Sequence, residues 1–234
     1  MGVALNTPND IEDALDNSLS WRRIELQALK AEILSAERKS PNSPLSRALS
    51  RSGVTMLYAH WEGFVKDACQ SYVDFVAKRR LKFAELNDGL LSTVLIGLGR
   101  RALSGDEAGL REILNAIRKP EISRALIPKK TIVDTKSNLR FSVLSEILDG
   151  IGFPVDDFVT KNQLIDKTLC DGRNSVAHGR DYFPDPGSFE ELHAEVLEMM
   201  ERLRDIIMSN VRTQGYRYQL QSSLDGTAER NRLV

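Results

Sequence analysis

The chain has 234 residues, of which 41% are hydrophobic and 28% are charged, a composition typical of a folded protein that buries a core. Its 32 Lys and Arg residues nearly cancel its 33 Asp and Glu residues, so the bulk charge argues against a protein that simply coats DNA. Aromatic residues make up only 6%, which favours helices over strands.

The cysteines and the apolar segments indicate the compartment. Cys69 and Cys170 stand far apart, so they do not form a disulfide framework and are expected to be reduced. No apolar stretch approaches the roughly 20 residues that cross a membrane, and the polar, acidic N-terminus does not resemble a secretory signal. We therefore expect a cytoplasmic protein with no membrane partner.

The N-terminal third predicts two long helices joined by a short loop. Apolar residues recur at three- and four-residue spacing from Ile11 to Ile33, and the first helix is expected to end near Lys39. Ser43 is expected to cap the second helix, with Pro44 as its first residue. A short proline-containing loop between two such helices predicts an antiparallel hairpin.

The middle of the chain is less regular. Helices are expected at residues 86–98 and 110–117, followed by a short extended piece at 131–133. Residues 99–140 carry ten Lys and Arg against five Asp and Glu. A phosphate backbone could bind such a stretch, although solvated surface is the more common explanation for it.

Three further helical segments are expected in the C-terminal half. One begins at about Asn138 and ends at Gly150 or Gly152, and one follows Pro154. Ser188 is expected to cap the last, with Glu191 completing a capping box. The expected fold is therefore all-α, an antiparallel helical bundle with a short irregular insertion. It forms a single domain over residues 1–218, and residues 219–234 form a disordered tail.

The motifs of common enzyme sites do not occur. Three histidines and two cysteines, without a His-Glu-x-x-His or paired Cys-x-x-Cys motif, predict no metal site, and no phosphate-binding glycine loop predicts a nucleotide cofactor. His60 falls on the apolar stripe of the second helix and is expected in the core. His193 lies in an acidic first turn and is expected at the surface.

The segment 171–180 carries the side chains with the clearest chemistry. On a helix, Asn174 and His178 share a face, and Arg173 lies five residues before His178. Arginine binds phosphate oxygens, histidine moves protons near neutral pH, and RNA supplies its own 2′-hydroxyl nucleophile. Alternatively, His178 merely caps the helix beside Gly179, with Arg173 as an exposed charge. Spacing alone does not decide between these interpretations.

Two sequence blocks together resemble a known family. The string Arg-Asn-Ser-Val-Ala-His-Gly from Arg173 to Gly179 resembles the Arg-x(4–6)-His signature of the HEPN superfamily, including a polar residue after the arginine. Residues 56–66, Met-Leu-Tyr-Ala-His-Trp-Glu-Gly-Phe-Val-Lys, are similar to the Trp-Glu-Gly-Phe helix of HEPN domains of the RiboL-PSP type. The two blocks occur in the right order, and the resemblance covers about residues 45–210.

The resemblance implies a role for each site residue. Many active members of that family are helical bundles that dimerise and cleave RNA without a metal at a site composed from two Arg-His helices. Arg173 would then bind phosphate and stabilise the transition state, and His178 would transfer a proton or act as a second stabiliser. Asn174 would orient the phosphate or His178. Glu62 would position Arg173, or lie at the surface. Arg180 would add positive charge beside the phosphate, or be simply exposed.

The resemblance implies a metal-independent endoribonuclease that leaves a 2′,3′-cyclic phosphate, without a cofactor. Its expected partners are RNA, a second copy of the chain, and an antitoxin or another protein of a toxin–antitoxin or phage-defence system. The alternative is a non-catalytic HEPN module that binds RNA or a partner protein. A third possibility is a structural adaptor in which the motif is idle.

Overall fold

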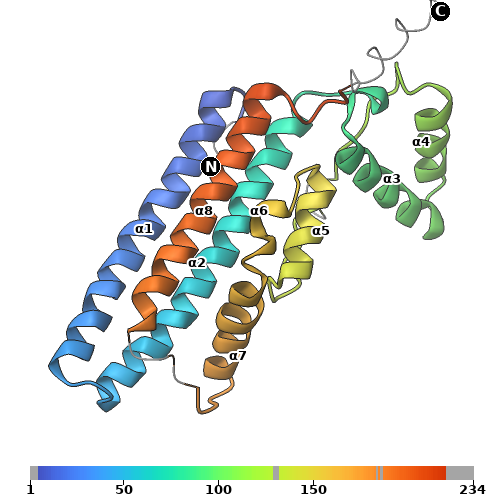
Figure 1. The fold of residues 1–234 in the computed structure, drawn as a ribbon. Helices are drawn as coiled ribbons and strands as arrows, with labels where there is room; N and C mark the ends of the chain where they lie inside the picture. The colour runs from blue at the N-terminus through green and yellow to red at the C-terminus, as the bar shows by residue number, and fades with distance from the viewer. Residues whose placement is uncertain (1–4, 129–131, 183, 185–186, 220–234) are drawn as a thin grey trace, which may run out of the picture.

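The computed structural model describes residues 5–128, 132–182, 184 and 187–219. Three long helices form its main body: α1 (Pro8–Lys39), α2 (Pro44–Ala77) and α8 (Ser188–Thr213). They pack against one another along their lengths (Figure 1). The described residues otherwise contain shorter helices and two isolated bridges, with no strand, so the predicted all-α bundle is confirmed.

The turn between α1 and α2 follows the predicted chemistry. The Ser43 side chain accepts a hydrogen bond from the Ser46 N–H, and Pro44 begins α2, where its missing N–H costs nothing. Asn42 takes a positive φ of 60°, a conformation that asparagine tolerates better than most residues. The predicted helical hairpin is therefore confirmed.

The core lies between α2 and its neighbours. Apolar side chains of α2 are buried on several sides, because α1, α8 and the later helices all pack against it. Its largest buried side chains are aromatic: Tyr58, Trp61, Phe64, Tyr72 and Phe75. A central helix buried on most of its faces fixes the positions of the elements around it.

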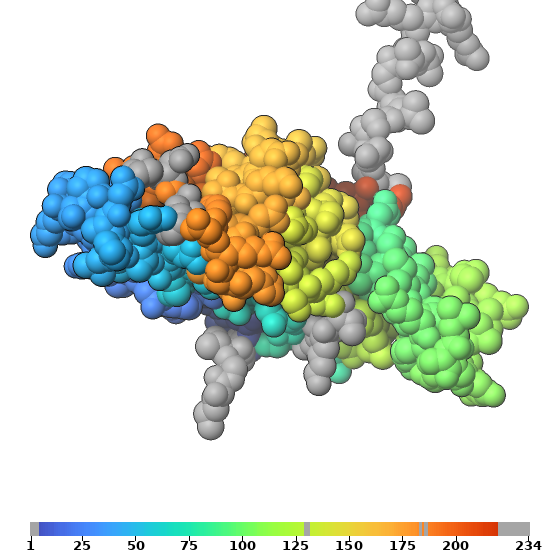
Figure 2. All heavy atoms as spheres, turned by 90° about the horizontal axis from the view of Figure 1, so that it is seen from below, coloured from blue at the N-terminus to red at the C-terminus, as the bar shows by residue number. Residues whose placement is uncertain are grey.

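Two helices extend away from this body as a hairpin. Helix α3 (Asp88–Leu103) starts at an Asn87 cap, and α4 (Glu107–Arg118) starts at an Asp106 cap. A short 3-10 turn, η1 (Phe83–Glu85), leads into them from α2. In Figures 1 and 2 the green α3–α4 hairpin stands out to one side of the body.

The remaining elements cover one side of α2. They are α5 (Phe141–Ile151), α6 (Asp156–Val159), the π-helical segment η2 (Leu164–Asp171) and α7 (Gly172–Ala177). Helix α5 ends at Gly152, whose φ of 81° is the left-handed conformation expected of a helix-ending glycine. The predicted helix ending at this glycine pair is confirmed, although it starts at Phe141 rather than Asn138.

Two expectations from the sequence are wrong. Ser188 is the first residue of α8 rather than its cap; Gly187 occupies the cap position with a φ of 84° and offers no side chain. His193 is buried, because it shares the inward stripe of α8 with Phe189 and Val196.

Two other predictions lie partly beyond the described residues. Residue 131 of the predicted extended piece is outside them, and Ile132 and Val133 are buried but do not belong to a strand. The predicted tail lies outside the described residues from position 220 onward. Within the described part of the chain, none of the helices is both long enough and apolar enough to traverse a lipid bilayer.

Candidate functional site

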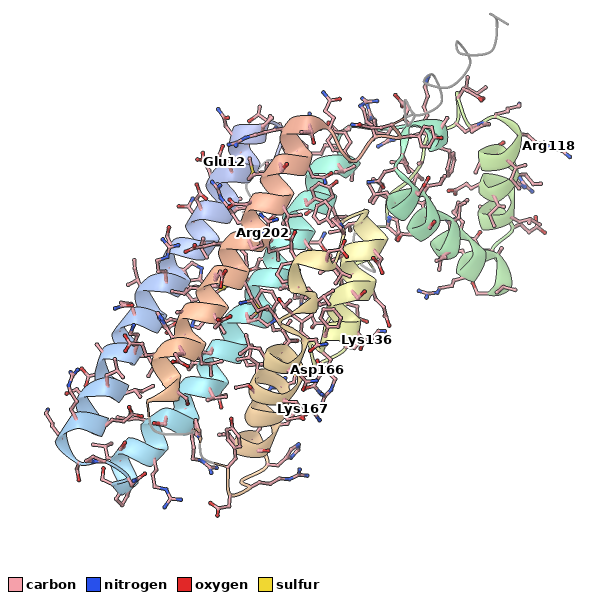
Figure 3. All side chains as sticks on the ribbon, in the orientation of Figure 1. Glu12, Arg118, Lys136, Asp166, Lys167 and Arg202 are labelled. Atoms are coloured by element: carbon pink, nitrogen blue, oxygen red, sulfur yellow. The ribbon has the colours of Figure 1, made fainter. Side chains whose placement is uncertain are left out.

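The helix that carries Arg173 follows directly on the π-helical segment. Helix α5 has no capping bond from the side chain of its own N-cap residue. Instead, Asp166 of the π-helical segment accepts a hydrogen bond from the Phe141 N–H at the start of α5, at 2.7 Å. Arg140 pairs with Asp171 at 2.6 Å. Figure 3 shows Lys136, Asp166 and Lys167 near one another where these elements meet. The loop before α5 thus holds both ends of η2 and fixes the start of α7.

Gly172 opens α7 without interrupting the helical segment. A Cβ atom there would lie 3.0 Å from the Tyr182 hydroxyl oxygen and 3.1 Å from the Val54 Cγ1 atom. This glycine therefore allows α7 to approach α2 and allows Tyr182, beyond the end of α7, to fold back over it. Gly172 is the first residue of α7.

The Arg173 guanidinium is held on several sides. Its Cζ atom lies 4.4 Å above the centre of the Tyr58 ring, within cation–π range. Its Nη1 donates to Asn174 Oδ1 and its Nη2 to the Ser137 carbonyl oxygen, both at 2.9 Å. Glu62 Oε2 lies 3.8 Å from Nη2. Nevertheless 24% of the Arg173 side chain is exposed, so an edge of the guanidinium remains open to a ligand.

Glu62 reaches Arg173 because of its place in the Trp-Glu-Gly-Phe block. Trp61 and Phe64 are fully buried in the core, whereas Glu62 turns towards α7 and its side chain is 20% exposed. A Cβ at Gly63 would lie 3.1 Å from Arg22 Nη2, so this glycine leaves room for a buried arginine from α1. The block thus contributes to the core, to the α1 contact and to the α7 contact from one stretch of α2.

Tyr58 is a site residue that the sequence analysis missed. Its hydroxyl oxygen accepts a hydrogen bond from the buried Leu139 N–H at 2.7 Å, while its ring supports Arg173. Burial, with a smaller contribution from the charge of Glu62, raises the pKa of Tyr58 above its ordinary value, so the hydroxyl stays neutral. Tyr58 precedes Glu62 by four residues on α2, and that spacing is the signal that could have identified it.

The Ser137 carbonyl is a second group that was missed. Thr135, Lys136, Ser137 and Asn138 form a tight turn in which the Asn138 N–H donates to the Thr135 carbonyl oxygen at 3.0 Å. Both central residues have positive φ, 49° and 63°, as in a type I′ turn, although neither is glycine. This conformation costs free energy for ordinary side chains, and it presents the Ser137 carbonyl to Arg173.

The other end of α7 is built differently. The Arg180 N–H donates to the Ser175 carbonyl oxygen (2.8 Å) and the Gly179 N–H to the Val176 carbonyl oxygen (3.0 Å), the pattern of a Schellman motif. Gly179 has a φ of 66°, which favours glycine. His178 is therefore the last residue of the helical turn, with its backbone N–H bonded to the Asn174 carbonyl oxygen.

His178 and Arg180 are both exposed. Within the described parts of the chain, the His178 imidazole forms no hydrogen bond or ion pair. The backbone around it is nevertheless held, because Arg51 of α2 donates to the carbonyl oxygens of Arg180 (2.9 Å) and Tyr182 (3.0 Å). The structure thus brings Arg173, Asn174 and Glu62 together, and it leaves His178 and Arg180 outside that cluster.

The charges around the cluster are largely balanced. The Arg140 guanidinium holds the pKa of Asp171 below its usual value, so this carboxyl stays ionised beside α7. Burial raises the pKa of the Cys170 thiol to about 11, and its Sγ donates to the Leu139 carbonyl oxygen. Cys170 is thus an inert core residue. Of the described residues in the basic stretch 99–140, the last ones, which include Ser137 and Arg140, contact the site.

Among the residues that the structure describes, no three or more His, Cys, Asp or Glu side chains lie close enough together to bind a metal ion. The chemistry available at the cluster is that of a fixed guanidinium, a carboxamide and an exposed imidazole. The first two bind anions, and the third exchanges protons.

Comparison with known proteins gives one match. The model of the family described as RiboL-PSP-HEPN matches residues 17–209 of this chain, which include both the Trp-Glu-Gly-Phe block on α2 and the Arg-His segment on α7. No curated protein and no solved structure matches the chain significantly.

Proposed function

Because the chain belongs to the RiboL-PSP-HEPN family, we propose that it is a metal-independent endoribonuclease. One observation carries this proposal: α7 presents Arg173, bonded to Asn174 and oriented by Glu62, on the same short helix whose end exposes His178. A fixed guanidinium with an open edge binds a phosphodiester, and an exposed imidazole can reach the groups that exchange protons in its cleavage.

The proposed reaction uses the ribose 2′-hydroxyl as the nucleophile. Arg173 binds the non-bridging phosphate oxygens and stabilises the charge that develops on them, and Asn174 helps to orient the phosphate. His178 accepts the proton of the 2′-hydroxyl as its oxygen attacks phosphorus, and the bond from phosphorus to the 5′ oxygen breaks. The leaving oxygen takes a proton from the His178 of a second copy. The products are a 2′,3′-cyclic phosphate and a 5′-hydroxyl.

The arrangement in one protomer supports a site shared by two copies. The Arg173 guanidinium turns towards Ser137 and Glu62, while His178 is exposed and, within the described residues, has no side-chain partner. A homodimer that apposes two α7 helices would surround one phosphate with two histidines and two arginines. Arg180, exposed beside His178, would add positive charge next to it.

The biological setting that fits this chemistry is a toxin–antitoxin or phage-defence system. An RNase that needs no metal and no cofactor is active as soon as it folds, so the cell requires a partner that restrains it. The proposal therefore includes an antitoxin or another defence protein that binds the exposed Arg-His surface, in the cytoplasm where the RNA is.

Cleavage of a labelled RNA mixture by the purified protein in excess EDTA tests the proposal. The wild type should cleave and His178→Ala should lose about 10²- to 10⁴-fold in rate, the usual contribution of a general acid or base. Lys39→Ala, at an exposed position at the end of α1, is the matched control and should cleave normally. The products should carry a 2′,3′-cyclic phosphate. Failure of the folded wild type to cleave any RNA in the mixture would overturn the proposal.

One observation favours a second function, a non-catalytic module that binds RNA or a partner protein. Two of the five N–H donors of Arg173 are already engaged within the protomer by Asn174 and Ser137, and the net formal charge of the chain is only −1. In that case fluorescence anisotropy should detect binding of RNA that the protein leaves intact, and Arg173→Ala should weaken this binding.

A further inference from the structure

The α3–α4 hairpin and the segment after it expose an unusual share of apolar surface. Of the twelve large apolar side chains that the described residues expose, seven lie between positions 96 and 126. A single exposed leucine is ordinary in a folded protein, but such a concentration indicates a surface that binds a partner. The seven are Ile96, Leu103, Leu110, Leu114, Ile117, Ile122 and Leu126.

Helix α4 aligns three of these side chains. Leu110, Leu114 and Ile117 follow one another at four- and three-residue spacing, so they form one stripe along the helix. Their exposed fractions are 53%, 43% and 70%. Gly109 and Ile113 lie on a different face, where Gly109 packs against α3 and Ile113 against the core. The stripe is therefore not the face that fastens α4 to its own hairpin.

The charges beside this stripe indicate what covers it. Glu107 and Arg118 are eleven residues apart, about three helical turns, so they lie on the same flank at opposite ends of the stripe. Glu107 pairs with Arg111 at 3.2 Å. Arg118 forms no ion pair with any residue that the structure describes, and Figure 3 shows its side chain directed away from the helix.

We propose that the α4 stripe binds the same stripe of a second copy as an antiparallel helix pair. Pairing Leu110 with Ile117 of the other copy brings the two Leu114 side chains together at the two-fold axis. Each Glu107 then meets Arg118 of the other copy, so the charge pattern is complementary to itself. A parallel pair would leave Glu107 of one copy and Arg118 of the other about three turns apart, so these complementary contacts would not form.

The position of the hairpin permits this pairing. Helix α4 stands clear of the three-helix body in Figures 1 and 2, and α7 lies at the other end of the molecule. The inference therefore goes beyond the proposed function, and it stands or falls independently of RNA cleavage. Because the stripe is smaller than the roughly 800 Å² that each partner buries in a stable complex, we expect reversible, concentration-dependent association.

Disulfide trapping tests the antiparallel arrangement. Leu114→Cys should form a covalent dimer under mild oxidation, because the two side chains meet at the axis. Asn115→Cys, the next residue on the same helix and also exposed, is the matched control and should cross-link far less. Native Cys69 and Cys170 are buried and leave the background low. Equal cross-linking of the two variants would overturn the proposal.

Charge exchange tests whether the occupant is a second copy. In sedimentation at increasing protein concentration, Glu107→Arg and Arg118→Glu should each weaken association by about tenfold, because two favourable pairs become two repulsive ones. The double variant should restore it. If wild type and Leu114→Glu sediment identically at every concentration, or if the double variant associates no better than the single ones, the stripe does not bind a second copy.

Discussion

The two ends of α7 are held in opposite ways. At the first end, the side chain of Arg173 is fixed by the Tyr58 ring, the Asn174 amide and the Ser137 carbonyl. At the second end only the backbone is fixed, through the Schellman motif and Arg51, while the His178 imidazole projects into solvent. A group that stabilises charge gains from being held in place before the substrate arrives, whereas a group that moves protons must be free to contact them.

Within this comparison, the largest effect is expected when the fixed end of α7 loses its arginine. Arg173→Ala should lower the rate of RNA cleavage by about 10²- to 10³-fold, the usual loss when one stabiliser of an oxyanion is removed. Arg173→Lys should be intermediate, because lysine keeps the charge but lacks the planar fork. Single-turnover kinetics on folded variants measure this. A rate for Arg173→Ala equal to that of wild type would remove Arg173 from the reaction.

The second prediction separates the two roles of Tyr58. Tyr58→Phe keeps the ring beneath Arg173 but leaves the buried Leu139 N–H without an acceptor, so the free energy of unfolding should fall by about 1–3 kcal/mol. Denaturant titration measures the change, with exposed Tyr218→Phe as the control, which should unfold like wild type. Unchanged stability of Tyr58→Phe would mean that the hydroxyl is not needed to hold the loop before α5.

The third prediction concerns the C-terminal end of α7, where Arg51 holds the backbone. Arg51→Ala removes the donor that bonds the carbonyl oxygens of Arg180 and Tyr182, and should cost about 1 kcal/mol of stability. Amide hydrogen exchange should accelerate at residues 179–182 and stay unchanged near Arg173, if the two ends are held independently. Faster exchange at both ends would show that they are coupled.

The smallest effect concerns pH. Burial, and secondly the charge of Lys30, lowers the pKa of His193 below its ordinary value of 6.5. Below that pH the unfolded chain binds a proton that the folded chain resists, so stability should decline as pH falls. His193→Gln should flatten the decline measured by thermal unfolding between pH 7.5 and 5.5. A decline of the same slope in His193→Gln and in wild type would show that this histidine does not cause it.

Sequence pattern predicted the elements whose signals are local. Pro44 with its Ser43 cap placed the α1–α2 turn, and apolar periodicity placed α1, α2 and α4, because these features depend on neighbours in the chain. The error at His193 has a plain cause. Its acidic neighbours suggested a surface position. However, His193 lies four residues after Phe189 and three before Val196, and this helical spacing places it on the buried stripe of α8.

The parts of the site that the sequence did not predict depend on the backbone. Ser137 contributes a carbonyl oxygen, which every residue has, from a turn with two positive φ angles at residues that do not favour them. Nor does spacing distinguish the π-helical segment η2 from an α-helix, since Leu164, Ile165 and Leu169 suit both. By contrast, the resemblance offered a contact of Glu62 with Arg173 as one of two alternatives, beside a surface position, and the structure places the two side chains 3.8 Å apart.

The buried arginine beside Gly63 has a consequence for how α1 can move. Arg22 donates to Asp67 at 2.7 Å and crosses α2 at Gly63, which has no side chain. Sliding α1 by one turn along α2 would force this buried guanidinium against Cβ atoms and separate it from the Asp67 carboxylate, which would destabilise the packing of the two helices. The contact of Arg22 with Gly63 and Asp67 thus allows only one register between α1 and α2.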